Sequence, residues 1–131
     1  MRDSHEPPKT VGDLMTVDLI AVRPTDRIKR AKDMLLSTGI HALPVLEGND
    51  VVGIVTSTDL IDDWSDDESI SSMMTPAPTL IDREATLTEA AQLMLAERTH
   101  HLLASDDREV IGILSTFDLL QVFAESMVAR A

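Results

Sequence analysis

Two short stretches of the sequence repeat one pattern of chemically active residues. They read GIVTSTDL at residues 53–60 and GILSTFDL at residues 112–119. In each stretch a hydroxyl residue precedes an aspartate by three positions, as Thr56 before Asp59 and as Ser115 before Asp118. An ionised carboxylate can accept two hydrogen bonds, which suits the neighbouring hydroxyls of a ribose. A strand that leads into a helix also offers free amides to an anion. The pattern therefore predicts a polar-ligand site in each stretch.

The same spacing has a purely structural interpretation. A hydroxyl residue followed three positions later by an acid is the sequence of a capping box. The hydroxyl accepts a hydrogen bond from a free amide of the helix, and the acid favours the positive end of the helix dipole. The glycines of the two stretches, Gly53 and Gly112, can allow a close backbone approach or serve strand packing. The motif alone leaves both interpretations open.

The two stretches belong to a long internal repeat. A shift of 59 residues aligns residues 11–61 with residues 70–120 without a gap. Identical residues meet throughout the alignment, for example His41 with His100 and Asp59 with Asp118. Two copies indicate a pair of half-domains produced by duplication, rather than a longer array.

Each repeat contains the elements that would position the motif. Hydrophobic spacing, turn residues and capping signals indicate the same elements in both copies. The expected elements are a helical turn at 11–15 and 70–74, an extended segment at 19–22 and 79–81, a helix opened by Thr25 and by Thr86, strands at 43–46 and 51–56 and at 102–104 and 110–115, and a last helix after Thr56 and after Ser115. The last helix of the second repeat is expected to be long, with Leu119, Phe123 and Met127 at i+4 spacing.

The order β-α-β-β-α, found twice, predicts an α/β (α+β) fold. One repeat alone would leave an apolar sheet face exposed, so we expect the two repeats to pack with pseudo-two-fold symmetry and to form equivalent clefts. The expected organisation is a flexible tail at 1–10, a first repeat at 11–64 and a second repeat at 65–131 with the C-terminal helix.

Composition excludes several classes of function. The chain has 131 residues, a net charge of −12 and 2% aromatic residues, which argues against nucleic-acid binding. It contains no cysteine, no apolar run long enough for a membrane span and no signal peptide, so we expect a cytoplasmic protein. The acidic surface fits either a halophilic source or an ordinary acidic protein.

Two other features have more than one interpretation. His41, His100 and His101 could suggest a metal site, but their spacing matches no helical metal motif, and we expect no metal. Trp64, in the acidic linker between the repeats, could fill the space between them or contact a partner.

The repeated motifs resemble those of the cystathionine β-synthase (CBS) domain family. Each copy has an MT pair, a segment like GIHALPVL and an ending like GIVTSTDL, and the resemblance covers residues 11–125. It implies a regulatory module without catalytic activity, usually a homodimer. The ligand implied is adenosyl, either AMP, ADP, ATP or S-adenosylmethionine, bound in clefts between the repeats. An unknown effector protein would receive the signal.

The resemblance also implies which residues bind the ligand. Each cleft would combine the aspartate of one repeat with the base-binding wall of the other. One cleft would use Asp118, Ser115, Ile20, Ile40 and His41, with His100 and His101 near the phosphate. The other cleft would use Asp59, Thr56 and Thr58, with Thr79 and Thr99 as its wall.

The sequence departs from the family pattern in ways that make the clefts inequivalent. His101 stands where related nucleotide sensors have an arginine, and Phe117 stands where the first repeat has Thr58. The negative charge of the chain favours singly phosphorylated AMP or cationic S-adenosylmethionine over ATP. The alternative function is a structural or dimerisation module that binds a protein partner and uses its aspartates only as helix caps.

Overall fold

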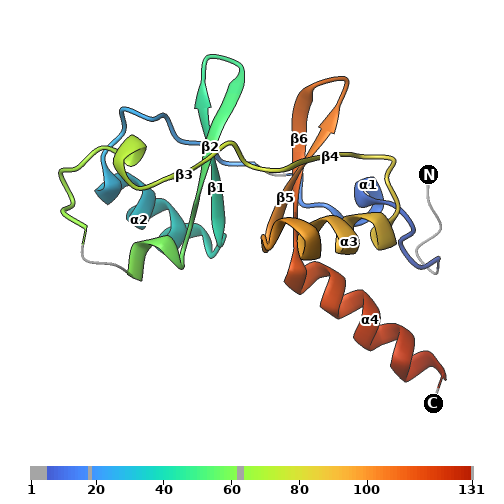
Figure 1. The fold of residues 1–131 in the computed structure, drawn as a ribbon. Coiled ribbons are helices and arrows are strands. Elements are labelled where there is room, and N and C mark those ends of the chain that lie inside the picture. Colours follow the sequence, from blue (N-terminus) through green and yellow to red (C-terminus); the bar gives the residue numbers. More distant parts are fainter. Residues whose placement is uncertain (1–5, 18, 62–63, 131) are drawn as a thin grey trace. The chain divides into compact units, whose positions relative to one another are not determined.

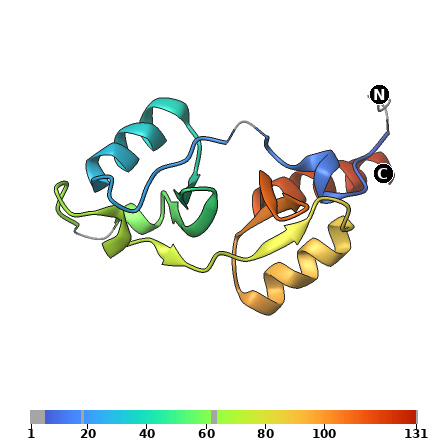
Figure 2. The same cartoon turned by 90° about the horizontal axis from the view of Figure 1, so that it is seen from above.

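The computed structural model describes residues 6–17, 19–61 and 64–130. The chain divides into two compact units, each of which is shown in Figures 1 and 2. The middle unit is Leu19–Pro78, and the terminal unit combines the segment before Leu19 with the chain from Thr79 onward. Each unit contains a three-stranded sheet and helices, which confirms the predicted α+β fold with two repeats.

The middle unit holds the strand hairpin of the first repeat. Its elements are α2 (Ile28–Thr38), β1 (Ala42–Glu47), β2 (Asp50–Thr56), η1 (Asp59–Ile61), η2 (Ile70–Ser72) and β3 (Thr75–Pro76). The sheet has the order β1-β2-β3 and both pairings are antiparallel. The expected first strand at 19–22 contributes only a parallel bridge between Val22 and Val45.

The terminal unit is built on the same plan. Its elements are α1 (Val11–Leu14), β4 (Leu80–Asp82), α3 (Leu87–Glu97), β5 (His101–Asp106), β6 (Glu109–Ser115) and α4 (Thr116–Arg130). In the order β4-β5-β6, β4 runs parallel to β5 and β5 antiparallel to β6. Thr16 forms an antiparallel bridge with Ile113 on β6. This bridge is equivalent to the pairing of Thr75 on β3 with Ile54 on β2 in the middle unit.

The two cores occupy equivalent positions, but each includes one element of the opposite sequence repeat. Ile70, from the second repeat, is fully buried in the middle unit, and its counterpart Val11 is fully buried in the terminal unit. The buried residues that form the two core clusters are Val22, Ile28, Ala31, Leu35, Leu43, Val45, Val55, Ile70 and Met73 in the middle unit and Val11, Ala90, Met94, Leu102, Ala104 and Leu114 in the terminal unit. Burial of these aliphatic side chains is the main stabilising term of each unit.

The two core helices begin in different ways. Thr86 caps α3 through a capping box with Glu89, as predicted. Thr25 does not open α2, so that prediction is wrong: the N-cap is Arg27, and its side chain makes no capping hydrogen bond. The carbonyls of residues 66 and 68 accept hydrogen bonds from the first amides of α2 instead, at 3.2 and 2.9 Å.

The last helices of the repeats also differ. After Thr56 the described chain forms only the short turn η1, and residues 62–63 lie outside the described residues. After Ser115 the helix is long, as predicted, and α4 runs beside α3 (Figure 1). Its apolar stripe is largely uncovered, because Phe123 and Met127 are 62% and 55% exposed.

The expected tail at 1–10 falls in two parts. Residues 1–5 lie outside the described residues. Lys9 and Thr10 are tied to the second repeat, because the Lys9 carbonyl accepts from the Leu87 amide and Thr10 bridges Thr86. Within residues 6–17, 19–61 and 64–130, no helix is long and apolar enough to span a bilayer.

Candidate functional site

The junction after β2 is a reciprocal capping box. The backbone amide of Thr56 donates to Oδ2 of Asp59 at 2.9 Å, and the Asp59 amide donates to Oγ1 of Thr56 at 3.3 Å. Both side chains are half-buried. Strand β2 ends at Thr56, so the box fixes the carboxylate at the end of the sheet.

The junction after β6 has the same geometry in the terminal unit. The Ser115 amide donates to Oδ2 of Asp118 at 2.9 Å, and the Asp118 amide donates to Oγ of Ser115 at 3.1 Å. Each aspartate therefore uses Oδ2 in its cap. In the part of the chain that the structure describes, Oδ1 of Asp59 and Oδ1 of Asp118 have no hydrogen-bond partner, so each can still accept from a ligand.

A histidine backbone adjoins each junction. The His41 carbonyl accepts from the Ser57 amide at 2.9 Å, and the His100 carbonyl accepts from the Thr116 amide at 2.9 Å. His41 and His100 are exposed, whereas His101 is half-buried at the start of β5, opposite Ser115. Each unit thus brings an aspartate, a hydroxyl residue and a histidine backbone to one end of its sheet.

The remaining predicted residues are distributed over both units. Ile20 is half-buried against the core of the middle unit, and Ile40 and Thr58 belong to the same unit. Thr79 and Thr99 belong to the terminal unit, where the Thr79 carbonyl accepts from the Leu103 amide and the Thr99 hydroxyl donates to the His101 carbonyl at 3.1 Å. Each predicted cleft draws residues from both units, so the combination of these residues in one site stays a prediction.

The glycines of the repeated motif serve close packing. A Cβ atom on Gly53 would lie 2.5 Å from Sδ of Met74, and one on Gly112 would lie 2.5 Å from Sδ of Met15. Each methionine comes from the MT pair of the opposite repeat. The backbone also approaches closely, because a Cβ atom would lie 3.1 Å from the Thr75 carbonyl oxygen at Gly53 and 3.1 Å from the Thr16 carbonyl oxygen at Gly112, so both roles that the sequence left open are observed.

Arg98 is a cationic residue that sequence reasoning missed. It ends α3 in the left-handed conformation with φ 53°, a position that the first repeat fills with Gly39 at φ 73°. This conformation is unfavourable for a residue with a side chain. The repeat alignment could have shown that an arginine replaces a glycine here, because it pairs Arg98 with Gly39. Arg98 adds a permanent positive charge two residues before His100.

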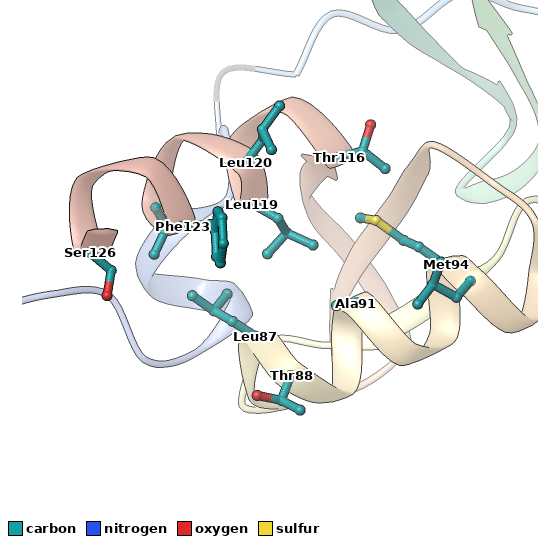
Figure 3. A pocket seen from close by; sticks show the side chains of 11 residues that line it. Leu87, Thr88, Ala91, Met94, Thr116, Leu119, Leu120, Phe123 and Ser126 are labelled. Carbon is teal, nitrogen blue, oxygen red and sulfur yellow. The ribbon is translucent and has the colours of Figure 1, made fainter. Parts of the chain in front are cut away.

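An apolar groove lies between α3 and α4 in the terminal unit. It has a volume of about 570 Å³. Figure 3 shows Leu119 and Phe123 of α4 facing Leu87 and Ala91 of α3. Among the described residues, no group of three or more His, Asp or Glu side chains is arranged to hold a metal ion.

The duplicated three-stranded unit, with one aspartate capping box after each strand hairpin, defines a class of paired α+β repeat modules. The family model of the CBS domain matches the chain twice, over residues 11–66 and 70–125. The chain therefore belongs to the CBS-domain family and carries two CBS domains in tandem, as the repeated motifs predicted.

Individual relatives agree with this family. The CBS-domain structure of NE2398 is similar with 28% identity and a TM-score of 0.80, covering 88% of this chain and 98% of that one. The structure of CBSX2 in complex with AMP is similar with 26% identity and a TM-score of 0.77, covering 90% and 98%.

A longer relative matches over a smaller part of its own length. An inosine-5'-monophosphate dehydrogenase from Korarchaeum cryptofilum is 31% identical over 103 residues, which are 78% of this chain. The chain spans only 22% of that enzyme, and 23% of a homoserine O-acetyltransferase from Methanocorpusculum labreanum that it also matches.

Proposed function

We propose that this CBS pair is a regulatory module that binds an adenosyl ligand, with AMP as the first candidate, and that it has no catalytic activity of its own. The observation that carries the proposal is the hydrogen bonding of the two aspartate carboxylates. Each carboxylate is fixed by its cap through Oδ2, while Oδ1 has no partner among the described residues. Such a fixed acceptor suits the hydroxyls of a ribose. The similar CBSX2 structure contains AMP, which supports the ligand class.

The proposed ligand contacts follow the predicted clefts. In one cleft Asp118 and Ser115 receive the ribose, Ile20, Ile40 and His41 surround the base, and His100 and His101 face the phosphate. In the other cleft Asp59, Thr56 and Thr58 receive the ribose, and Thr79 and Thr99 form the wall. The Thr99 hydroxyl already donates within its own turn, so we expect its methyl group to be the part that contacts a base.

The negative charge of the chain favours a ligand with few phosphate groups. The chain carries a net charge of −12, which repels an anion within a screening length of about 8–10 Å. Arg98, two residues before His100, supplies a permanent positive charge that partly offsets this repulsion. AMP, or the cationic S-adenosylmethionine, is therefore preferred over ATP.

The test is a thermal-unfolding series with AMP, ADP, ATP and S-adenosylmethionine. A ligand at 100 times its dissociation constant adds about 2.7 kcal/mol to the free energy of unfolding. Two substitutions separate binding from capping. Asp118→Asn keeps an oxygen that can cap and removes the charge, whereas Asp118→Ala removes both.

We expect Asp118→Asn to remove the part of the ligand-induced shift that comes from the Asp118 cleft, while the unliganded melting temperature falls little. Asp118→Ala should lose the same part of the shift and also about 0.5–2 kcal/mol of stability. The substitutions Asp59→Asn and Asp59→Ala test the other cleft in the same way. An unchanged AMP shift in both asparagine variants would contradict the proposal and leave the structural module as the better function.

We further propose that the module pairs with a second copy of itself. Apolar residues at equivalent positions are exposed in both repeats, namely Leu36 at 85%, Leu95 at 79%, Ile61 at 80% and Leu120 at 62%. Leu95 and Leu120 line the same groove between α3 and α4. A surface that recurs at equivalent positions suits a self-complementary partner.

Sedimentation velocity tests the pairing. Leu95→Glu should convert a dimer to a monomer, because it places a charge in the groove. Ala96→Glu adds the same charge at the next, exposed position of α3, outside the groove, and should leave the dimer intact. A parent chain that is monomeric at high concentration would overturn this part of the proposal. The effector protein and a cytoplasmic location stay predictions.

A further inference from the structure

Trp64, the single tryptophan of the chain, is tied to one of the two site aspartates. Its indole Nε1–H donates to the backbone carbonyl of Asp59 at 3.2 Å. Asp59 is also the residue whose carboxylate caps the Thr56 amide at 2.9 Å. Asp59 is therefore held by two hydrogen bonds, one from the Thr56 amide at the end of β2 to its carboxylate and one from the Trp64 indole to its backbone carbonyl.

The short turn η1 needs such a support. It consists of three residues, and among the described residues its amides make two backbone hydrogen bonds of 3.3 and 3.2 Å, from Leu60 to the Ser57 carbonyl and from Ile61 to the Thr58 carbonyl. The last carbonyls of a helical segment have no partner within it. Among the described residues, the Trp64 indole is the group that satisfies the Asp59 carbonyl.

Trp64 is itself held in place. Its side chain is half-buried and packs against the core of the middle unit. The linker that follows is attached to α2, because the Ile28 amide donates to the Glu68 carbonyl at 2.9 Å and Lys32 Nζ donates to Asp66 Oδ1 at 2.7 Å. A partly buried indole on an anchored segment can hold its acceptor in a defined position.

The second repeat lacks this support. The residue equivalent to Trp64 is Phe123, which has no N–H to donate and is 62% exposed on α4. Asp118 lies in the first turn of that 15-residue helix, whose i to i+4 hydrogen bonds fix its backbone. The two junctions share their capping geometry but are held by different means.

We propose that Trp64 is a positioning residue for the Asp59 carboxylate, which makes the Asp59 half-site dependent on the linker between the repeats. Asp118 is positioned by α4 and does not depend on Trp64. The ligand-binding consequence rests on the proposed function, but the positioning itself does not.

A ligand-free experiment tests the positioning. Trp64→Phe removes the indole N–H and introduces the residue that the second repeat has at this position. Amide hydrogen exchange of Thr56 should become several-fold faster, because its acceptor Asp59 is less well held. The Ser115 amide, which has the same cap, is the internal control and should not change. Amides at the centre of the β1–β2 pair should also not change. Unchanged exchange at Thr56, or an equal increase at Ser115, would overturn the proposal.

A calorimetric experiment with AMP tests the consequence for binding. In the Asp118→Asn background, where the Asp59 site remains, Trp64→Phe should weaken AMP binding by about two- to tenfold, the effect of one lost hydrogen bond. In the Asp59→Asn background it should have no effect. Equal weakening in both backgrounds would show a general structural role and overturn the proposal. If the parent chain binds no AMP, the proposed function fails, and the exchange experiment alone decides whether Trp64 positions Asp59.

Discussion

At the scale of single residues, the two interpretations of the repeated aspartates are compatible. A capping box needs one carboxylate oxygen, and Asp59 and Asp118 both use Oδ2 for it. The second oxygen is thereby oriented, because the cap removes the rotational freedom of the side chain. A helix cap of this kind leaves an oriented acceptor for the proposed ligand contact, and the sequence could predict the cap but not that one carboxylate oxygen would remain without a partner among the described residues.

The closest packing in the repeated motif gives a stability prediction. A Cβ atom at Gly112 would lie 2.5 Å from Sδ of Met15 and 3.1 Å from the carbonyl oxygen of Thr16. Gly112→Ala should therefore lower the free energy of unfolding by about 1–3 kcal/mol, measured by chemical denaturation. Combining it with Met15→Ala should give less than the sum of the two losses, because the smaller residue removes the sulfur. Fully additive losses would contradict this contact.

Arg98 should have opposite effects on stability and on binding. Arg98→Gly relieves the left-handed backbone and should stabilise the chain by up to about 1 kcal/mol, raising the melting temperature by roughly 3–5 °C. It also removes a cation near His100 and should weaken AMP binding several-fold, as measured by calorimetry.

Arg108 supplies the matched control for that prediction. It has φ 71° in the turn between β5 and β6, at the opposite end of the hairpin from the His101–Ser115 pair. Arg108→Gly should stabilise the chain by a similar amount and leave AMP affinity unchanged. If both variants weaken binding equally, the loss reflects general charge and not a local contact of Arg98.

At the scale of elements, the start of α2 shows what local sequence cannot reveal. Thr25 fits a capping signal, yet α2 begins later, at Ile28, where backbone carbonyls of the linker replace a side-chain cap. Capping by a backbone carbonyl leaves no residue-type signature, because every residue has one. In α3 the predicted side-chain cap forms, since Thr86 and Glu89 satisfy each other locally.

The linker that caps α2 should make stability depend on pH. The hydrogen bond and the positive charge of Lys32 lower the pKa of Asp66 from its ordinary value of 3.8. A lowered pKa stabilises the folded chain above the ordinary pKa, and this contribution is lost as the pH falls through the folded-state value. Lys32→Gln should thus lower the melting temperature slightly at pH 6, and its difference from the parent should shrink below pH 4.

Two controls define that effect. Asp66→Asn should produce the same pH-dependent loss, and the double variant should lose no more than either single one. Because the pair is solvent-exposed, molar salt should also reduce the difference. A Lys32→Gln difference that stays constant from pH 6 to pH 3 would contradict the assigned cause.

At the scale of the whole molecule, the gapless repeat was enough to predict a duplicated fold, because hydrophobic spacing and motif order recur over 51 aligned positions, and the resemblance of its motifs predicted the family. It was not enough to predict the composition of the compact units. The first helical turn of each repeat packs in the core formed mainly by the other repeat. Ile70 therefore belongs to the core that contains Ile28, and Val11 to the core that contains Ala90. A two-residue strand such as β3 has no sequence pattern that could show which sheet it joins.

This exchange predicts how fragments of the chain will fold. A fragment of residues 19–78 contains the whole middle unit, including Ile70, Met73 and β3. A fragment of residues 11–66, which follows the sequence repeat, is of similar length but lacks all three. Full burial of one such side chain contributes about 1.5–3 kcal/mol, and domains near 60 residues have little stability in reserve. The 19–78 fragment should therefore show dispersed NMR spectra and a cooperative thermal transition, whereas the 11–66 fragment should be unfolded. Extending the second fragment to residue 78 should restore folding; a cooperative transition in the 11–66 fragment would show that the exchanged turn is not needed for the core.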